Sequence, residues 1–245
     1  MEPAEFARSY RLEAEHWWFA SRRRLVAALL APHLPADPHR RVLDVGCGTG
    51  GNLKLLQTWG RVTGIDINAL PLSFARHRNG SLAQGSALHL PFAGQTFGLV
   101  AAFDVLYHRQ IASDRQALAE LRRVLAPGGW LVITDSALPL LWSAHDRLYH
   151  TRRRYTLPHL RRRLQAAGLH PVFCSYANMV LLPLLLPTRL LMRRVLTADF
   201  DLHPPPRWLN RALMSLRNLE TAWLSRGHTL PVGSSLVCLA QRDSL

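Results

Sequence analysis

R-V-L-D-V-G-C-G-T-G-G, residues 41–51, is the stretch of sequence that decides the fold. Val42, Leu43 and Val45 form a short apolar run of the kind that a buried parallel strand needs. The run ends in glycines, which permit left-handed torsions and a close approach of the backbone to a ligand. The helix expected next, over residues 52–58, directs its free N–H groups at this loop. The stretch therefore predicts a strand, a loop that binds a ligand with a negative or polar edge, and a helix.

Two kinds of ligand are compatible with this local pattern. Gly46, Gly48 and Gly51 satisfy the dinucleotide pattern G-x-G-x-x-G. Asp66 follows the first of these glycines by 20 residues, where an acid that binds ribose is expected, so NAD is one candidate. Asp44 begins a second pattern, D-x-G-x-G-x-G, which resembles the first motif of class I S-adenosylmethionine (SAM)-dependent methyltransferases. That resemblance implies that the acid and the glycine loop hold the methionine part of SAM.

A later segment favours the methyltransferase. R-V-L-A-P-G-G-W-L-V-I, residues 123–133, closely resembles the family's segment that leads into the fifth strand, and a nicotinamide enzyme has no matching requirement there. The resemblance covers residues 41–135. It implies an α/β fold with a Rossmann-like, doubly wound sheet of seven strands, the last of them antiparallel, with N-terminal helices and a helical insertion before the last strand.

The apolar runs and the prolines divide the chain into four predicted parts. They are an N-terminal helical lid, residues 1–40; the SAM-binding core, 41–177; a helical apolar insertion that caps the acceptor, 178–230; and the last strand of the core sheet, 231–245. Within the insertion, residues 179–196 are strongly apolar, but prolines and arginines interrupt them well short of the ~20 residues of a membrane span. We therefore expect no transmembrane helix, and burial, a dimer contact and a place on a membrane surface remain open for this stretch.

The resemblance also implies which residues bind the cofactor. Asp66 ends the predicted strand 61–66, so its carboxylate lies at the carboxyl edge of the sheet and can accept hydrogen bonds from both ribose hydroxyls. Ser86 stands where the family has an acid that holds the adenine amino group, and its hydroxyl can still accept a hydrogen bond. The expected cofactor-binding residues are Asp44, Gly46, Cys47, Gly48, Gly50, Asp66, Ile67, Ser86, Ala87, Leu88 and Asp104.

Methyl transfer from a sulfonium is an in-line displacement, so a protein contributes alignment and, where required, removal of a proton. The groups involved should come from the loops after the fourth and fifth strands, at the carboxyl edge of the sheet. Histidine suits a base near neutral pH because its reference pKa is about 6.5. The sequence does not choose among the candidate catalytic residues, which are His108, Asp135, His145, His150 and, for positioning, Tyr155.

Two further segments are similar to those of a bacterial methyltransferase group often associated with glycan or specialised-metabolite pathways. One is H-W-W-F at residues 16–19, followed by three arginines at 22–24; the other is H-D at 145–146, followed by H-x-R-R-R-Y at 150–155. The aromatic cluster either packs over the domain edge or forms a lid that excludes water. The second segment follows the fifth strand, so it either faces the methyl donor or covers the surface, with its histidines bonded to loop carbonyls.

The net charge of +14 is the unusual feature of the composition, and Lys54 is the one lysine among 30 basic residues. Either a coding bias or attraction to an anionic acceptor, a nucleic acid or an anionic membrane surface accounts for it. D-V-L-Y, residues 104–107, does not resemble the N/D-P-P-Y/F of amino-directed nucleic-acid methyltransferases, and no Pro-Cys pair supplies a nucleophile for cytosine. Nucleic acid is therefore not the expected acceptor.

The three cysteines are widely separated and show neither a disulfide framework nor zinc spacing, so we expect no metal. The acidic N-terminus has no secretion signal, and the cytoplasm is the expected compartment. Together these features predict a SAM-dependent methyltransferase that modifies an O or N atom of a small-molecule or lipid-linked acceptor, with peripheral membrane contact left open. The alternatives are an RNA-directed methyltransferase and an NAD-binding or non-catalytic Rossmann-fold protein. Acceptor identity and oligomeric state are not predicted.

Overall fold

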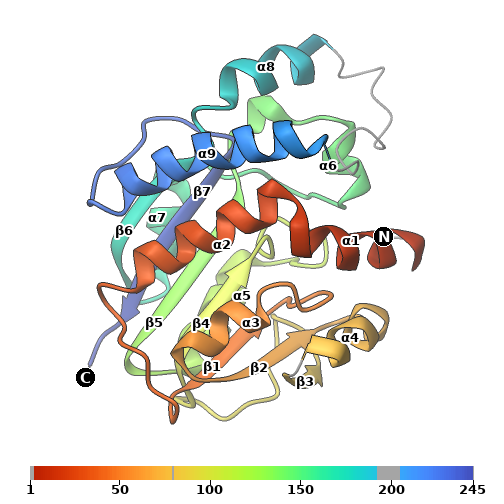
Figure 1. Cartoon of the computed structure of the whole chain (residues 1–245). Helices are drawn as coiled ribbons and strands as arrows, with labels where there is room; N and C mark the ends of the chain where they lie inside the picture. The colour runs from red at the N-terminus through yellow and green to blue at the C-terminus, as the bar shows by residue number, and fades with distance from the viewer. Residues whose placement is uncertain (1–2, 79, 192–204, 245) are drawn as a thin grey trace.

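The structure, a computed structural model, describes residues 3–78, 80–191 and 205–244. Seven strands in this part of the chain form one sheet in the order β3-β2-β1-β4-β5-β7-β6 (Figure 1). β1 to β5 pair in parallel, whereas β7 runs antiparallel to both of its neighbours, which confirms the predicted Rossmann-like sheet. The strands are β1 Arg41–Val45, β2 Arg61–Asp66, β3 Ser81–Gln84, β4 Phe97–Phe103, β5 Leu125–Ser136, β6 Leu169–Ala177 and β7 Ser235–Arg242.

The central strands are covered on both faces, which is why their sequences are almost continuously apolar. Leu99, Val100 and Ala101 of β4 are fully buried, as is Leu43 of the neighbouring β1. The A-P-G-G segment, residues 126–129, which we expected to lead into the fifth strand, is itself part of β5, and Gly128 within it has a φ of 70°. Because all the parallel strands end at one edge of the sheet, the segments that follow them lie close together there.

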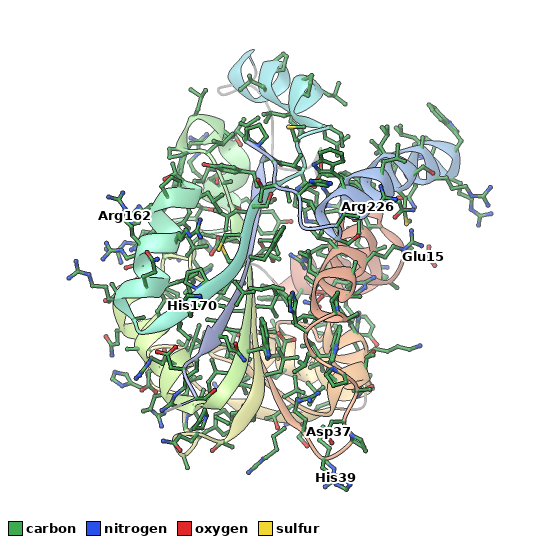
Figure 2. All side chains as sticks on the ribbon, turned by 90° about the vertical axis from the view of Figure 1, so that its left-hand side faces the viewer. Glu15, Asp37, His39, Arg162, His170 and Arg226 are labelled. Carbon is green, nitrogen blue, oxygen red and sulfur yellow. The ribbon has the colours of Figure 1, made fainter. Side chains whose placement is uncertain are left out.

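Helices cover both faces of the sheet. α2 and α9 lie side by side on one face, and α5 and α7 contact each other on the other, as Figures 1 and 2 show from two sides. Three single turns of 3₁₀ helix, η1 Gln57–Trp59, η2 Arg76–Arg78 and η3 Pro139–Leu141, join longer elements. The α-helices of the described residues are α1 Pro3–Glu15, α2 Trp17–Leu30, α3 Leu53–Leu56, α4 Ala69–Ala75, α5 Asp114–Val124, α6 Ala144–Leu148, α7 Leu157–Ala166, α8 Leu182–Leu191 and α9 Arg207–Leu224.

The N-terminal region divides into two helices with different roles. α2 buries Leu25, Val26 and Leu29 in the hydrophobic core, so it is a permanent part of the helical layer. α1 instead contacts α2 and α4 at the edge where the parallel strands end. Of the segment expected to be a lid, only α1 therefore lies over the ligand-binding edge.

The C-terminal insertion contains α8 and α9, and residues 192–204 between them are outside the described part of the chain. α9 packs along α2. The last strand begins at Ser235, four residues later than expected, and pairs with both β5 and β6. Within the ranges that the structure describes, no helix is long and apolar enough to cross a lipid bilayer.

Candidate functional site

The glycine loop after β1 has the backbone geometry that the sequence predicts. Gly46, Gly48 and Gly50 have φ values of 69°, 54° and 83°, in the left-handed region that favours glycine. The amides of Gly46 and Cys47 both donate to the carbonyl of Ile65, at 2.7 and 3.0 Å, and tie the loop to the end of β2. A Cβ on Gly46 would lie 2.6 Å from Cγ2 of Val105, so a side chain there would displace the loop after β4.

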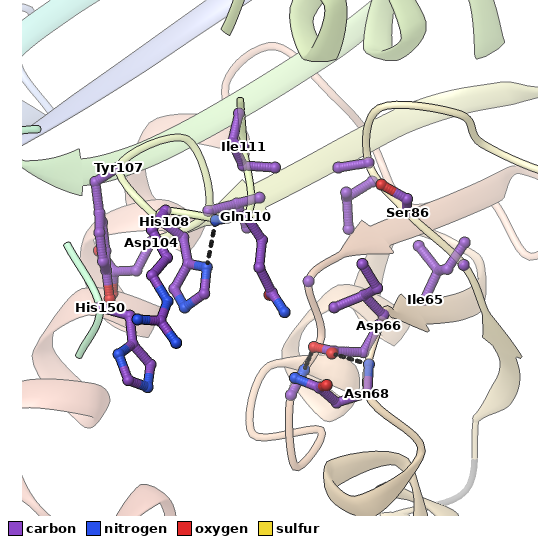
Figure 3. Close-up of a pocket in the computed structure, with 18 of the residues that line it drawn as sticks. Ile65, Asp66, Asn68, Ser86, Asp104, Tyr107, His108, Gln110, Ile111 and His150 are labelled. Carbon is purple, nitrogen blue, oxygen red and sulfur yellow. Dashed lines mark hydrogen bonds between the residues drawn. The ribbon is translucent and has the colours of Figure 1, made fainter. Parts of the chain in front are cut away.

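Asp66 lies at the end of β2 and holds the same loop. Its Oδ2 accepts a hydrogen bond from the Gly48 amide at 3.0 Å, and its Oδ1 accepts one from the Asn68 amide at 2.9 Å (Figure 3). Burial raises the pKa of Asp66, and these backbone donors oppose that rise. The carboxylate therefore forms part of the wall of the site while its backbone bonds fix its orientation.

A cavity of about 680 Å³ opens beside the glycine loop. It is of the size that small-molecule sites usually have. Its walls come from the ends of β1 and β2, from the loops that follow β1, β2, β3 and β4, and from Phe6 of α1 and the segment after α6 (Figure 3). The expected site residues that line it are Gly46, Gly48, Asp66, Ile67, Ser86, Ala87, Asp104, His108 and His150.

The remaining predicted residues lie elsewhere. Leu88 and Gly50 are outside the cavity wall, and Cys47 is buried behind it, where burial raises the pKa of its thiol. The side chain of His145 is outside the described residues. The other expected residues away from the wall are Asp44, Asp135 and Tyr155.

Asp44 is fully buried directly before the glycine loop. Its Oδ2 has no hydrogen-bond partner among the described residues, which is uncommon for a buried carboxyl oxygen. Burial raises its pKa to about 8; Arg22 opposes the rise, and the negative charges of Glu13 and Asp66 add to it. A buried acceptor that has no hydrogen-bond partner, placed directly before the glycine loop, suits a polar or cationic group of a ligand bound at that loop.

α1 contacts the outer side of the glycine loop through Glu13, which was not among the predicted site residues. Oγ1 of Thr49 donates to Oε2 of Glu13 at 2.7 Å, and a guanidinium nitrogen of Arg78 lies 3.2 Å from the same oxygen. A Cβ on Gly51 would lie 2.5 Å from Cδ of Glu13, so the fourth glycine makes room for this carboxylate. Burial raises the pKa of Glu13. No local pattern marks Glu13, because its partners lie far away in the sequence.

Arg22 of α2 provides the second connection between the N-terminal helices and the site. It forms an ion pair with Asp104, a cavity residue at the end of β4 whose φ is 58°. The Asp104 amide donates to the carbonyl of Thr134 at 2.8 Å, which holds this unfavourable conformation in place. The guanidinium also lies over the ring of Phe19, 5.6 Å from its centroid, so the H-W-W-F segment contributes to the packing around the site.

Two histidines face the cavity together. The rings of His108 and His150 meet edge to face with centroids 5.9 Å apart. Burial, with the positive charges of His150 and Arg109, lowers the pKa of His108 to about 4, so its ring is neutral at neutral pH. Its Nδ1 accepts from the Gln110 amide at 3.2 Å, which assigns the proton of the neutral ring to Nε2 (Figure 3).

The charged side chains and the tyrosine of the H-D…H-x-R-R-R-Y segment make contacts within the protein. Arg154 and Asp146 form a buried two-bond pair, with Nε to Oδ1 at 2.7 Å and Nη2 to Oδ2 at 3.1 Å. The hydroxyl of Tyr155 is buried and donates toward Asp114 Oδ2 at 3.2 Å, and Arg153 binds the same carboxylate at 2.7 Å. These charges require partners because they are removed from water. Among the described residues from 145 to 155, Tyr149 and His150 line the cavity.

Asp135 is also placed as a structural group. It is buried in β5, and its Oδ1 accepts from the Ser136 amide at 2.8 Å. Burial, together with the negative charge of Asp104, raises its pKa well above the usual range. Asp135 lies away from the cavity wall, and its role in catalysis stays a prediction.

Residues 43–133 match the family model described as "Methyltransferase domain". The chain is 40% identical over 107 residues to the 2-phytyl-1,4-naphtoquinone methyltransferase of Thermosynechococcus vestitus, covering 40% of this chain and 46% of that protein. It is 37% identical over 140 residues to the malonyl-[acyl-carrier protein] O-methyltransferase of Enterobacter lignolyticus, covering 54% and 55%. The chain thus spans about half the length of the curated relatives it matches.

One solved structure resembles the whole chain. A Haloferax volcanii complex between the Trm112 methyltransferase activator and a methyltransferase contains a chain that matches with a TM-score of 0.64 and 20% identity. The match covers 98% of this chain and 97% of that one. At this level of identity the likeness concerns the fold, including the N-terminal helices and the C-terminal insertion.

Proposed function

We propose that this chain, which carries a methyltransferase domain at residues 43–133 and has the fold of the class I SAM-dependent methyltransferases, transfers the methyl group of SAM to a small-molecule acceptor. One observation carries the proposal: a single cavity joins the glycine loop and Asp66 to a pair of histidines. Cofactor-binding groups and groups able to move a proton thus line the same space.

The residues present suit SAM. The left-handed glycines let the backbone approach a ligand, and Asp66 offers carboxylate oxygens where a ribose is expected. The unpartnered oxygen of Asp44 suits the ammonium group of the methionine part, and Ser86 and Ala87 suit the adenine. When bound, SAM supplies an electrophilic methyl group on a sulfonium.

The protein's own contribution is alignment and proton handling. His108 is neutral and carries its proton on Nε2, so it donates a hydrogen bond that orients the acceptor. His150, whose left-handed backbone has a φ of 51°, lies beside His108 with the two rings edge to face, and it removes the acceptor proton. Phe6 and Tyr107 form apolar parts of the wall that exclude water.

The residues that line the cavity and the names of the matched relatives together support one class of acceptor. The cavity wall mixes apolar side chains, such as Val105 and Ile111, with the two histidines, which suits a largely apolar acceptor that bears one hydroxyl, carboxyl or amine. One matched relative is named for a phytyl-naphthoquinone, and the other is named as an O-methyltransferase of malonyl-[acyl-carrier protein]. The three cysteines are free, in keeping with a cytoplasmic enzyme.

Calorimetric titration with S-adenosylhomocysteine, with NAD in parallel, tests the cofactor. We expect micromolar binding of S-adenosylhomocysteine and a loss of roughly tenfold to a hundredfold in Asp66→Ala, since hydrogen bonds to a charged group contribute about 1.5–3 kcal/mol. Asp37→Ala, at a side chain that is 44% exposed and does not line the cavity, is the matched control and should bind as the wild type does. Binding of NAD without binding of S-adenosylhomocysteine would indicate that the glycine loop binds a dinucleotide instead.

Transfer of a labelled methyl group from SAM to hydroquinone, phenol and carboxylic-acid acceptors tests the chemistry. Loss of a general base typically slows a reaction by about 10²–10⁴, so His150→Gln should reduce turnover by this factor while its affinity for S-adenosylhomocysteine stays unchanged. His170→Gln, on the exposed face of β6, is the control (Figure 2). Cofactor binding without turnover on these acceptors, combined with turnover on RNA, would support the nucleic-acid alternative instead.

A further inference from the structure

The outer face of α9 carries a stripe of exposed large apolar side chains. Trp208 is 71% exposed, Leu216 43%, Leu219 70% and Trp223 48%. Their spacing of eight, three and four residues places them on one side of the helix. At 1.5 Å per residue the stripe is about 22 Å long, and a tryptophan lies at each end. The helix therefore has two apolar sides, because the neighbouring Leu209 and Leu213 are half-buried toward the protein.

The inner side of α9 already provides the contacts that the fold requires. Arg217, Glu220 and Leu224 are buried, and Arg217 forms an ion pair with Glu220. The Glu220 carboxylate also accepts from the amides of Asn178, at 2.6 Å, and Val180, at 3.3 Å. The exposed stripe is thus not needed to hold α9 on the protein.

The exposed charged side chains that α9 itself carries are all positive. Arg207 and Arg211 are exposed, one turn apart, on the flank of the stripe, and Arg226 is exposed just after the helix. All 18 residues of α9 are described, and its one acid, Glu220, is buried. The chain as a whole has a net charge of +14. A partner for this face must accept apolar side chains and offer negative charge next to them.

The position of α9 connects this face to the cavity. The side chain of Asn210 accepts from the Trp17 amide at 2.9 Å and donates to the Glu15 carbonyl at 3.1 Å, at the junction of α1 and α2. α1 carries Phe6, which lines the cavity. Figure 2 shows α9 projecting from the body on the side that bears Arg226, away from Arg162 on α7.

We propose that α9 binds the surface of an anionic lipid bilayer, with its apolar stripe in the headgroup region and its arginines against lipid phosphates. Tryptophan is suited to this interface because its ring is amphipathic, and arginine can extend its charge back to the phosphates while its stem stays in apolar surroundings. A narrow stripe of four side chains is small beside the 1,200–2,000 Å² or so that a stable protein interface buries, whereas a helix of this pattern can lie in a bilayer surface. The membrane contact does not require methyl transfer.

Flotation of the full chain with vesicles tests the contact. Vesicles of phosphatidylglycerol and phosphatidylcholine should bind the protein, and vesicles of phosphatidylcholine alone should bind it much more weakly. Trp208→Gln combined with Leu219→Gln should weaken binding by tenfold or more; both side chains are largely exposed, so the fold should be retained. The control is Val172→Gln, an exposed apolar residue on β6, which should bind as the wild type does.

A second pair of variants separates local charge from net charge. Arg207→Gln with Arg211→Gln should weaken binding to the anionic vesicles, by roughly fivefold for each arginine near the surface. Arg161→Gln with Arg162→Gln removes the same charge from α7 and should have little effect. Equal losses in both double variants, or equal binding by the wild type and the Trp208/Leu219 variant, would overturn the proposal. A dimer in mass photometry that only the Trp208/Leu219 variant dissolves would also overturn it, because the occupant would then be a second copy.

Discussion

Two arginine triplets, residues 22–24 and 152–154, are identical in sequence and opposite in structural role. The first lies on α2, where successive residues point in directions about 100° apart. Arg22 therefore reaches Asp104 in the cavity wall, Arg23 reaches the carbonyls of Glu13 and Gly51, and Arg24 reaches Asn218 of α9. The second lies in an irregular segment and is used to fix that segment: Arg152 binds the carbonyls of Ile111 and Ala112, while Arg153 and Arg154 pair with Asp114 and Asp146.

The difference teaches that the secondary structure around a charged motif decides its use. A helix distributes three arginines over three neighbouring elements, here the end of β4, the glycine loop and α9. An irregular segment at the sheet edge has backbone carbonyls and buried acids that need hydrogen-bond partners. Its arginines therefore bind groups in and next to the segment itself. The first triplet therefore belongs to the site, and the second supports the loop from which His150 projects.

Arg154→Ala should have the largest effect on stability. It leaves Asp146 buried without its ionic partner, and breaking a buried pair in this way typically costs about 3–5 kcal/mol. Urea unfolding measures the loss, and Arg162→Ala, at an exposed position on α7, is the control that should change stability by less than about 0.5 kcal/mol. A loss for Arg154→Ala as small as that of the control would mean that the second triplet is not structural.

Asp44→Asn sharpens the comparison between two buried acids: Asp146, which has an ionic partner, and Asp44, whose Oδ2 has no hydrogen-bond partner among the described residues. The folded pKa of Asp44 is raised to about 8, so between pH 4 and 8 the folded chain holds a proton that the unfolded chain has lost. Wild-type stability should therefore fall relative to Asp44→Asn as the pH rises, by at most about 1.4 kcal/mol per pH unit. Urea titrations at pH 5, 6 and 7 measure this difference.

The same variant has a second expected result. S-adenosylhomocysteine should bind Asp44→Asn more weakly than the wild type, because the unpartnered carboxyl oxygen is the one that suits the ammonium group. A stability difference that is flat with pH would show that Asp44 is ionised and paired in the folded chain.

Arg22→Ala should have the smallest effect on stability and a clear effect on the site. Its partner Asp104 is partly exposed, so the loss of unfolding free energy should be about 1 kcal/mol. Affinity for S-adenosylhomocysteine should fall roughly fivefold to tenfold, because Asp104 loses the charge that fixes it in the cavity wall. Arg24→Ala removes only an exposed hydrogen bond to Asn218 and should leave both quantities unchanged. If the two variants behave alike, the first triplet has no special relation to the site.

The cofactor half of the site was predictable because its signals are local. Strand, left-handed loop and following helix are consecutive, and glycine is the residue that tolerates the φ values found at positions 46, 48 and 50. Asp66 and Ser86 follow directly from the ends of strands that the apolar pattern identifies, and both line the cavity. The acceptor half was only partly predictable, since Tyr155 and Asp135 have suitable chemistry but are turned into the core.

By itself, then, the sequence determined the seven-stranded sheet, the glycine loop and the resemblance to methyltransferases, because each rests on short segments of the chain. Only the tertiary structure decided which charges meet. Arg22 and Asp104 are 82 residues apart, and no pattern in the sequence around either residue predicts that they form a pair. The exposure of Trp208 and Leu219 was likewise decided by which side of α9 packs on α2. Partners of this kind depend on the packing of whole helices, which the alternation of apolar and polar residues along one segment does not specify.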